Sequence, residues 1–592
     1  MLREREPTAV AFALLGVAIA YWFPAFVDPF ATGFGDWQMI HHNWEAGHVA
    51  LTRHGEWPLW NPYHCGGITM WGNPEAQHLS PFFFLSLLMG TTLAIKLMVA
   101  VHAWAGLAGM YLLARRCFHL EPPAALFASL AWGCSGFWAW QIGGGHGTFV
   151  PFYLAPWVLL AWRAAVADWR MSALLAALMA LVAFEGGTYP FPYFVLLLAF
   201  DAVVLLGRGP RRGAVVTAAL LSGGLTVLLS AVRWVPSLIT LSRIPRNADI
   251  PDVVAPWEIP EMLARPWFPW VHPDHPFVWP EYSAYLGVAA TLVGFAGVYA
   301  ALRGRRYEPV AGLVVFGTLM AGHFADWAPW SLLHELPVYR ALRAPSRFSV
   351  LFTLYFALLG GLAIERWLPP LLDGRALRKV LDGRPWLARL APWIVVVALV
   401  LDPILYGIGH NAYRWRHSPI EGTEQAEPFR LVRGNDYYRI YASLPRRNQG
   451  TPACYVGNLD WPISHHLWLG PKPQARVLGG AGELDGAGRT VNEAWADVTM
   501  SRPGQLVFNQ NHDPDWRTDV GEIEKHKGRL AVALPAGRHR VTARYQPPYL
   551  RLSVGLTAAG ALLVVLLGAW ARFRPRVAAP EKPEQTRPDG RP

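Results

Sequence analysis

Residues 8–26 read TAVAFALLGVAIAYWFPAF, a run without one charged side chain. A helix needs about 20 largely apolar residues to cross a bilayer, so this run is long enough for one span. Arg3 and Arg5 precede it, as in a signal peptide, but no clean small-x-small cleavage site follows, and Trp22 and Pro24 lie near its end. We therefore interpret the run as an uncleaved first transmembrane helix.

Similar apolar runs recur along the whole chain. They cover residues 91–113, 123–142, 150–166, 171–189, 191–207, 214–232, 283–302, 309–322, 346–368, 392–408 and 550–571. The segment 80–90 is too short to span and is expected to be re-entrant or interfacial. The composition also indicates a membrane protein. Only 16% of the 592 residues are charged, whereas about a quarter of the residues of a soluble domain are charged. The sequence predicts a polytopic α-helical membrane protein with about twelve transmembrane helices.

The net charge of +11 lies in short basic clusters at the ends of these runs. The clusters are Arg115-Arg116, Arg208-Arg211-Arg212, Arg303-Arg305-Arg306, Arg375-Arg378-Lys379 and Arg572-Arg574-Arg576. An N-terminus placed inside puts every cluster on the cytoplasmic side, as the positive-inside rule expects. This distribution argues against a nucleic-acid partner. It predicts a multi-pass protein of the cell inner (plasma) membrane with both termini in the cytoplasm.

The same topology divides the chain into domains. Residues 1–408 form the membrane domain, with outer loops at 27–79, 233–282 and 323–345, and residues 409–549 form an outer region before the last helix. Residues 572–592 are rich in proline and charge and are expected to be a disordered cytoplasmic tail.

The outer region 409–549 has a β pattern. Apolar and polar residues alternate in 505–508, 529–534 and 538–545, with turn residues between them. Short strands over about 140 residues fit a small extracytoplasmic β-sandwich. Two roles stay open for it: a rigid spacer, or a module that grips a polymer or shapes a substrate groove.

Loop 27–79 contains the first candidate site residues. Asp36 stands at the start of a run with helical spacing of apolar residues, which begins at Trp37 and fits a helix lying in the membrane interface. A carboxylate at this position can simply cap the helix. Further along, a dense Gly/Pro/Asn stretch with Trp57 and Trp60 presents a second carboxylate, Glu75. Loops that only connect two spans are usually shorter and contain fewer aromatic, glycine and proline residues, so we expect this loop to be functional.

Other polar groups lie at the outer ends of spans. His146 stands in GGGHG, and Glu185 lies near a membrane boundary, where an ionisable group is costly and therefore a functional candidate. Basic residues are expected to be few outside, so those in two segments are unusual: Arg243 and Arg246, and Arg340, Arg343 and Arg347. Arginine can hold a lipid phosphate through two hydrogen bonds. The alternatives are a solvated loop residue for His146 and ordinary headgroup anchoring for the arginines.

The cysteines and the histidine-rich segment do not identify a metal site or a redox site. Cys65 and Cys454 both fall outside, so a disulfide between them stays open, and Cys117 and Cys134 fit small apolar fillers. His272, Asp274 and His275 are a weak metal-binding pattern, because Pro273 stands between them and disfavours a helix. The sequence contains no Walker loop, dinucleotide fingerprint or Gly-x-Ser-x-Gly elbow, so no nucleotide from the cytosol is expected.

Several motifs, in this order, resemble the YfhO-like bacterial membrane proteins, which belong with the GT-C glycosyltransferases. They are 35–36 (GD), 72–77 (GNPEAQ), 80–81 (SP), 185–190 (EGGTYP), 336–348 (LPVYRALRAPSRF), 513–517 (DPDWR), 520–521 (VG), 534–537 (LPAG) and 545–547 (YQP). The resemblance covers nearly the whole chain.

The resemblance implies an inverting transfer of a sugar, on the outer face, from a polyprenyl-phosphate carrier to an envelope glycan, lipid or protein. Asp36 would be the general base, with Glu75 as the alternative base. Glu75 and Glu185 would orient sugar hydroxyls, and Trp37, Trp57 and Trp60 would stack on sugar rings. The phosphate would be held by Arg343 or Arg347, with Arg243 as a further candidate, and His146 would be another substrate-binding residue.

Two questions stay open at this point. Many GT-C enzymes show two adjacent acidic residues in this loop, whereas this chain has Asp36 followed by Trp37, so a divalent metal is not established as a cofactor. Two other functions also remain. One is a transporter or flippase of a lipid-linked glycan, and the other is a non-catalytic scaffold for assembling envelope polymer.

Overall fold

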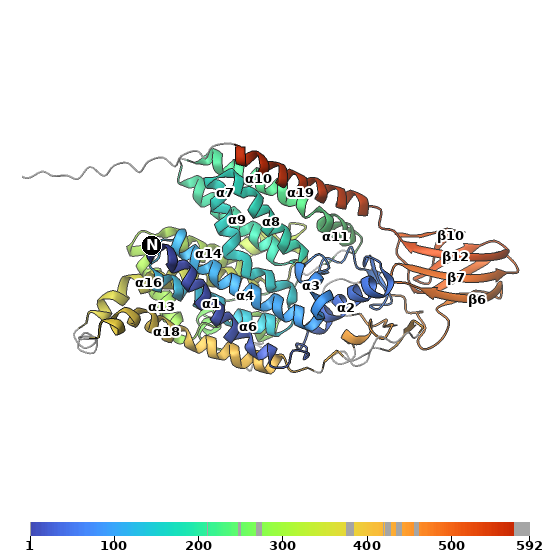
Figure 1. The fold of residues 1–592 in the computed structure, drawn as a ribbon, viewed down its shortest axis with the longest axis horizontal. Helices are drawn as coiled ribbons and strands as arrows, with labels where there is room; N and C mark the ends of the chain where they lie inside the picture. The colour runs from blue at the N-terminus through green and yellow to red at the C-terminus, as the bar shows by residue number, and fades with distance from the viewer. Residues whose placement is uncertain are drawn as a thin grey trace, which may run out of the picture.

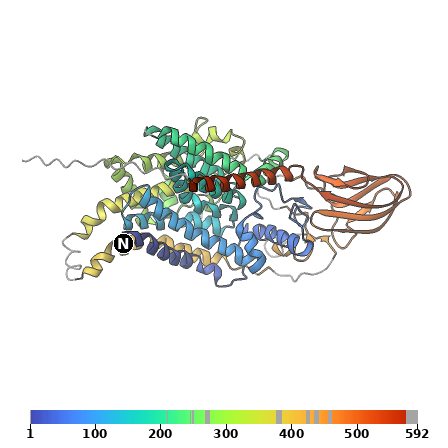
Figure 2. The same ribbon diagram turned by 45° about the horizontal axis from the view of Figure 1, so that its top comes forward.

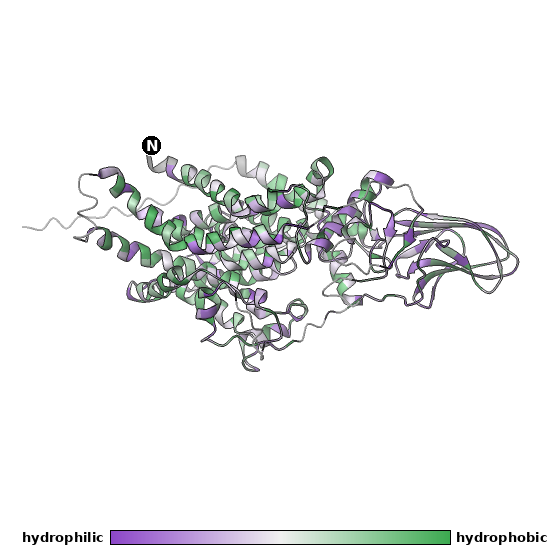
Figure 3. Cartoon of the chain, turned by 90° about the horizontal axis from the view of Figure 1, so that it is seen from below, coloured by the Kyte–Doolittle hydropathy of each residue, from purple (hydrophilic) through white to green (hydrophobic). Residues whose placement is uncertain are grey.

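Long apolar helices make up most of the molecule. The computed structural model describes residues 2–209, 211–244, 246, 250–267, 275–374, 384–417, 419–420, 428–433, 441–454 and 461–573. The helices form an elongated bundle, and a β-sandwich lies beyond one end of it (Figure 1). Hydrophobic residues dominate the bundle, while hydrophilic residues are frequent in the sandwich and the loops next to it (Figure 3).

Eight of the described helical segments are long and apolar enough to cross a membrane. They lie in α1 (Leu2–Phe26), α4 (Thr91–Arg116), η1 with α7 (Gly147–Leu154, Ala155–Ala167), α9 (Pro190–Gly207), α10 (Arg212–Leu229), η5 with α16 (Pro345–Phe348, Ser349–Leu372), α18 (Pro385–Arg414) and α19 (Leu550–Phe573). Three shorter apolar segments contain α8 (Ser172–Phe184), α13 (Val288–Arg303) and α14 (Tyr307–Met320). The chain is therefore a multi-pass membrane protein, as its sequence predicts.

The run 123–142 forms two helices, where the sequence predicts one continuous span. These are α5 (Pro122–Gly133) and α6 (Gly136–Gly143). At the break the backbone N–H of Gly136 donates to the carbonyl of Tyr285 at 2.7 Å, and a Cβ on Gly136 would lie only 2.5 Å from that of Tyr285. The small residue thus lets α6 turn and pack against a distant loop. The short segment 80–90 forms α3 (Pro81–Met89), capped by the hydroxyl of Ser80, which accepts a hydrogen bond from the N–H of Phe82.

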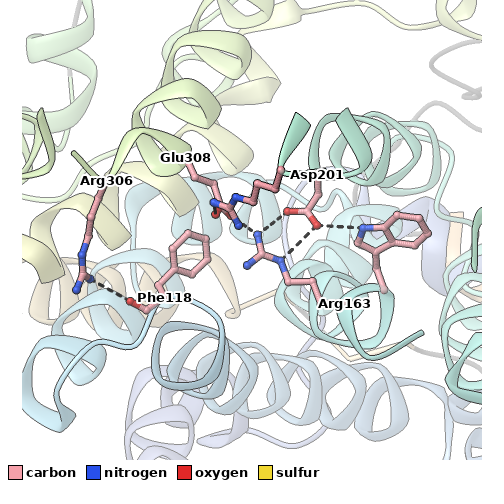
Figure 4. A network of polar contacts seen from close by, with 7 residues as sticks. Phe118, Arg163, Asp201, Arg306 and Glu308 are labelled. Atoms are coloured by element: carbon pink, nitrogen blue, oxygen red, sulfur yellow. Dashed lines mark hydrogen bonds and ion pairs between the residues drawn. The ribbon is translucent and has the colours of Figure 1, made fainter. Parts of the chain in front are cut away.

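An ion-pair network joins three apolar helices away from the sandwich (Figure 4). Arg163 on α7 contacts Asp201 on α9 at 2.5 Å and also pairs with Glu308 on α14. The indole N–H of Trp162 donates to Asp201, and Arg208 pairs with Glu308. Charged groups inside a bundle are tolerated when they are paired and hydrogen-bonded. This network therefore holds α7, α9 and α14 in fixed relation.

The sandwich consists of two antiparallel four-stranded sheets. One has the order β10 (Glu522–His526), β11 (Arg529–Leu534), β8 (Gly504–Asn511), β5 (Ala475–Val477), and the other β6 (Gly482–Arg489), β7 (Glu493–Met500), β12 (Gly537–Tyr545), β9 (Trp516–Thr518). Their facing residues, such as Leu506, Val532 and Val541, form the core. The three predicted alternating runs are β8, β11 and β12. The strands of the sandwich occupy only 475–545, because α18 extends to Arg414. Of the described residues between Arg414 and these strands, Phe429 packs on Tyr63 and Thr451 accepts a hydrogen bond from the N–H of Gly66, both in loop 27–79.

Loop 27–79 connects the sandwich with the bundle. It contains α2 (Trp37–His54), β1 (Trp60–Asn61) and β2 (Ile68–Thr69), and Figure 2 shows it between the two parts. The ring of Trp60 lies in the sandwich core against Trp516. Cys65 and Cys454 form a disulfide, which answers the question that the sequence leaves open. Arg446 forms two hydrogen bonds with Glu45 of α2, at 2.6 and 2.7 Å.

Candidate functional site

Asp36 and His146 come together from two tightly interlocked loops. The backbone N–H of Asp36 donates to the carbonyl of Gly144, and a Cβ on Gly145 would lie 2.4 Å from the backbone nitrogen of Asp36. Gly145 also has φ +102°, a conformation that favours glycine. His146 Nε2 lies 3.5 Å from Asp36 Oδ2, and both side chains are partly exposed. The carboxylate makes no capping hydrogen bond to α2, so its role is not that of an ordinary helix cap.

Gln141 fixes the orientation of the imidazole. Its amide nitrogen donates to the carbonyl of Pro280 at 2.9 Å and to Glu281 Oε2 at 3.3 Å. Its amide oxygen therefore faces His146, where it accepts a hydrogen bond from Nδ1. A neutral imidazole that donates from Nδ1 has an unprotonated Nε2, and this nitrogen faces Asp36. Burial lowers the pKa of His146 more strongly than Glu281 and Asp36 raise it, which favours the neutral form.

A buried ion pair lies behind Gln141. Arg347 donates to Glu281 through Nε at 2.7 Å and through Nη2 at 2.5 Å. Its side chain is 2% exposed, and that of Glu281 is 9% exposed. Burial raises the pKa of Glu281, but the guanidinium of Arg347 outweighs it and brings this pKa to about 2. Glu281 is thus fully ionised, and Arg347 is already neutralised by a protein carboxylate.

Aromatic rings connect this pair with a neighbouring loop. The guanidinium of Arg347 lies over Tyr189 at 4.5 Å from the ring centroid and over Phe149 at 4.9 Å. The hydroxyl of Tyr189 accepts a hydrogen bond from the backbone N–H of Arg343 at 3.0 Å. Phe149 in turn lies 4.9 Å from the ring of His146, between centroids. Residues 141–149, 189 and 281, and the segment 343–347, therefore form one continuous cluster next to Asp36.

An apolar cavity of about 700 Å³ adjoins this cluster. Residues of α9, α10, α11 (Ala231–Arg243), α19 and the segment 337–342 line it; among them are Phe191, Val227, Trp234, Leu238 and Leu556. Helices α10, α11 and α19 lie along one side of the molecule in Figure 1. We call this cavity the lateral groove.

Three charged side chains line the lateral groove: Glu75, Arg246 and Arg340. Burial lowers the pKa of Arg246, whereas Tyr189 and Glu75 raise it, and Arg343 and Arg347 lower it. These interactions place Arg246 close to both the groove and the cluster around Tyr189. The groove therefore combines an apolar surface with two cationic side chains, of which Arg246 lies close to the cluster around Tyr189.

The structure gives other contacts to five residues that the sequence singles out. Glu185 is fully buried and pairs with His102 at 2.9 Å, and Arg243 forms two hydrogen bonds with Asp515 of the sandwich. Trp37 is fully buried and donates to the carbonyl of Ile142. The rings of Trp37 and Trp60 have no open face, and Trp57 packs against Trp71 and Phe84. All five hold the loop, the bundle and the sandwich together.

Two residues of the site do not stand out in the sequence: Gln141 and Glu281. Gln141 falls inside a predicted span, and Glu281 precedes an apolar run without a distinguishing motif. Tyr189 belongs to the motif 185–190 (EGGTYP), but the sequence assigns no role to its side chain. Arg246 is visible as a rare basic residue outside a span, next to Arg243. Its position beside Glu75 follows only from the fold.

Metal-binding groups do not converge at Asp36 in the described part of the chain. His272 and Asp274 lie outside the described residues. Among the residues that are described, one set of three candidate ligands comes together, His64 with Cys65 and Cys454, and both sulfur atoms are used in the disulfide. The donor set needed for a metal beside Asp36 is therefore not found among these residues.

His275 lies between two carboxylates. Its Nδ1 is 3.2 Å from Asp252 and its Nε2 is 3.0 Å from Glu258, and the hydroxyl of Tyr282 donates to Asp252 at 2.9 Å. The imidazolium form can donate to both carboxylates at once, whereas a neutral ring can donate to only one. The hydrogen bond to Asp252 raises the pKa of His275, burial lowers it, and Glu258 raises it further, with a net increase above 6.5.

We expect this arrangement to make thermal stability depend on pH. Because the folded-state pKa of His275 is raised, its contribution is complete below pH 6.5 and is lost as the pH rises through the folded-state pKa. In nanodiscs, His275→Gln should lower the melting temperature at pH 6 and have a smaller effect at higher pH. The exposed His465 supplies the control His465→Gln, which should leave the profile unchanged. A His275→Gln effect independent of pH would contradict the prediction.

The chain was compared with known proteins. No family model and no curated protein matches it, so the resemblance to the YfhO-like proteins stays a prediction. Among solved structures, the arabinofuranosyltransferase AftD from Mycobacteria is similar with a TM-score of 0.44 and 17% identity, over 72% of this chain and 28% of that chain. Its R1389S mutant gives a TM-score of 0.43 and 17% identity, over 72% and 29%.

The apo oligosaccharyltransferase of Archaeoglobus fulgidus is similar with a TM-score of 0.48 and 12% identity, over 77% of this chain and 65% of that chain. The chain thus spans less than a third of AftD and just under two thirds of the oligosaccharyltransferase.

Proposed function

We propose that this chain is an inverting membrane glycosyltransferase that takes a sugar from a polyprenyl-phosphate carrier. The observation that carries the proposal is the position of the lateral groove. A long apolar surface with Arg246 and Arg340 along it suits an isoprenoid chain joined to a phosphate. The other end of the same cluster offers Asp36, a partly exposed carboxylate next to a neutral histidine. The groove and the cluster that adjoins it thus offer an apolar surface for the lipid, arginines for the phosphate and a candidate base.

In the proposed reaction an acceptor hydroxyl attacks the anomeric carbon of the sugar. Asp36 takes the proton of that hydroxyl, the new glycosidic bond forms, and the bond to the carrier phosphate breaks with inversion. The protonated carboxylic acid then faces the unprotonated Nε2 of His146, which can accept a hydrogen bond from it. In the neutral ring Gln141 fixes the tautomer, because its oxygen accepts from Nδ1–H and so leaves Nε2 as the unprotonated nitrogen.

The departing phosphate needs cationic hydrogen-bond donors. Arg347 is paired with Glu281 and buried, so we assign it to positioning rather than to the phosphate. Arg246 and Arg340 line the groove, and the pairing of Arg340 with Glu335 at 3.3 Å is exposed, unlike that of Arg347. The backbone N–H of Arg343 donates to the Tyr189 hydroxyl. We assign these three arginines to the phosphate, and Glu75 to the sugar hydroxyls or, as the alternative, to the role of base.

The proposal places this site on the outer face of the plasma membrane. Basic residues follow or end the helices that lead away from Asp36, for example Arg116 on α4 and Arg208 after α9. The positive-inside rule puts such ends in the cytoplasm. The acceptor would then be an envelope glycan, lipid or protein.

The test is a transfer assay with purified protein in lipid nanodiscs. A panel of radiolabelled polyprenyl-phosphate sugars is offered together with envelope extract, and release of carrier phosphate and labelling of acceptor are measured. Transfer with at least one donor supports the proposal. Protein that is folded, binds envelope glycan through the sandwich and turns over no donor would favour a non-catalytic scaffold. Movement of an intact lipid-linked glycan across the bilayer would favour a flippase.

A second prediction concerns the lateral groove itself. Leu238→Trp adds a ring where we expect the isoprenoid chain, so kcat/KM for the lipid-linked donor should fall by tenfold or more, about 1.4 kcal/mol. Leu220→Trp is the matched control, because Leu220 lies on α10, is 72% exposed and does not line the groove. Equal activities of the two variants would contradict the assignment of the groove to the lipid.

A further inference from the structure

On one face of the sandwich, two arginines lie over the ring of Trp468, whose backbone is hydrogen-bonded to the sheet. In β8 the side chains of Leu506 and Phe508 point into the core, so Asn509 points outward, as does Arg476 next to Ala475 in β5. The amide of Asn509 accepts from the backbone N–H of Trp468 at 3.0 Å and donates to its carbonyl at 2.8 Å. These bonds fix Trp468 on the outer side of the sheet β10-β11-β8-β5.

Both guanidinium groups lie over the same indole ring. Arg476 is exposed and lies 4.4 Å from the ring centroid of Trp468, and Arg529 lies at 5.5 Å. The indole N–H donates to the carbonyl of Pro473 at 2.9 Å, which restricts rotation of the ring. Arg529 is 9% exposed, and its Nη1 donates to the carbonyl of His466 at 3.1 Å. The Nε of Arg529 is buried without a hydrogen-bond partner.

The positive charge at this place is not balanced. Among the described residues, no carboxylate lies within 4 Å of either arginine, whereas Arg540 and Arg544 on the other sheet pair with Asp497 and Glu493. The charged groups around the neighbouring His526 are also mostly basic. They are Arg529, Lys527 and His466, with one acid, Glu524. Burial and the nearby Arg476 lower the pKa of Arg529. Two adjacent cations without a carboxylate create a local potential that attracts anions.

We propose that Trp468, Arg476 and Arg529 form a binding site for the acidic groups of a glycan polymer. A guanidinium stacked on an aromatic ring keeps its edge N–H groups available, and they match the two oxygens of a carboxylate or a phosphate. Arg476 is the contact residue, and Arg529 is a fixed positive charge behind it. The site lies on the sandwich, beyond the bundle in Figure 1, so it suits a soluble polymer better than a lipid headgroup. It is independent of the proposed transfer reaction.

The test measures binding to full-length protein in nanodiscs of uncharged lipid. The probes are polygalacturonate, a poly(glycerol phosphate), uncharged dextran and vesicles that contain anionic lipid. We expect one or both acidic polymers to bind, with dissociation constants that rise with salt, and dextran not to bind. Arg476→Ala should weaken binding tenfold or more, and Trp468→Leu should weaken it because the guanidinium loses its support.

Arg540→Ala is the matched control. Arg540 also lies over a tryptophan, Trp495, at 4.7 Å, but its charge is paired with Asp497. It should therefore leave binding unchanged. Preference between the two acidic polymers assigns the site to carboxylates or to phosphates. Three results would each overturn the proposal. They are no binding of either acidic polymer, an equal loss of polymer affinity in Arg476→Ala and Arg540→Ala, and binding of anionic vesicles alone. Melting temperatures of all variants exclude loss of the fold as the cause.

Discussion

Asp36→Asn is expected to lower kcat for sugar transfer by a factor of about 10²–10⁴, the usual contribution of a positioned general base. Asparagine keeps the size of the side chain but cannot take the proton of the acceptor hydroxyl. Because the carboxylate makes no capping hydrogen bond to α2, the substitution should leave the fold intact. The measurement is release of carrier phosphate in nanodiscs at saturating donor. KM for the donor should change little, since the groove is untouched.

Glu75→Gln separates the two candidate bases. Glu75 lines the lateral groove, so its loss should raise KM more than it lowers kcat if it only orients the sugar. Asp485→Asn, on an exposed position of the sandwich, is the control for the loss of one carboxylate. If Glu75→Gln abolished turnover while Asp36→Asn stayed active, the base would be Glu75, and our assignment of Asp36 would be wrong.

Arg347→Met should be the most destabilising single change that we predict, at about 3–5 kcal/mol, because it leaves the carboxylate of Glu281 buried without its partner. Unfolding of the protein by denaturant in detergent micelles measures the effect. The double variant Glu281→Leu/Arg347→Met removes both charges and should recover most of the loss. Arg540→Met breaks an exposed ion pair and should cost less than about 1 kcal/mol.

The same ion pair has a pH signature. The pKa of Glu281 is about 2 in the folded protein against an ordinary value of 4.5, so the pair contributes fully above pH 4.5 and its contribution is lost as the pH falls toward 2. The wild-type protein should therefore lose more stability in acid than Arg347→Met does. The prediction is wrong if the free energy of unfolding depends on pH in the same way in the wild type and in Arg347→Met. It is also wrong if the double variant is as unstable as Arg347→Met.

Patterns within one helix or strand were predictable from the sequence, and contacts between distant segments were not. Apolar runs such as 8–26 and alternating runs such as 529–534 report their structure directly. The break falls at 133–136 (GCSG), where Ser135 is the N-cap residue of α6, but the close approach of Gly136 to Tyr285 joins residues almost 150 positions apart. The sequence therefore predicts one helix where two form.

For the candidate site, the sequence identified unusual residues but not their partners. Asp36 and His146 are unusual enough in their loops to be noticed, and the structure brings them together. Glu185 and Arg243 are equally unusual in sequence, but each has a buried or sandwich partner, His102 and Asp515. A rare charged residue thus indicates that some partner exists, and only the fold identifies that partner.

The disulfide between Cys65 and Cys454 also determines when during synthesis the molecule can be completed. The two cysteines are 389 residues apart, and the loop that contains Cys65 also places Trp60 in the sandwich core, whose strands lie within 475–545. A nascent chain that has produced α2 and Asp36 must therefore keep this loop unfinished through most of translation. Enzymes that form disulfides would meet Cys65 long before its partner exists. Asp36 thus belongs to a part of the protein that matures last, although it is among the first to be made.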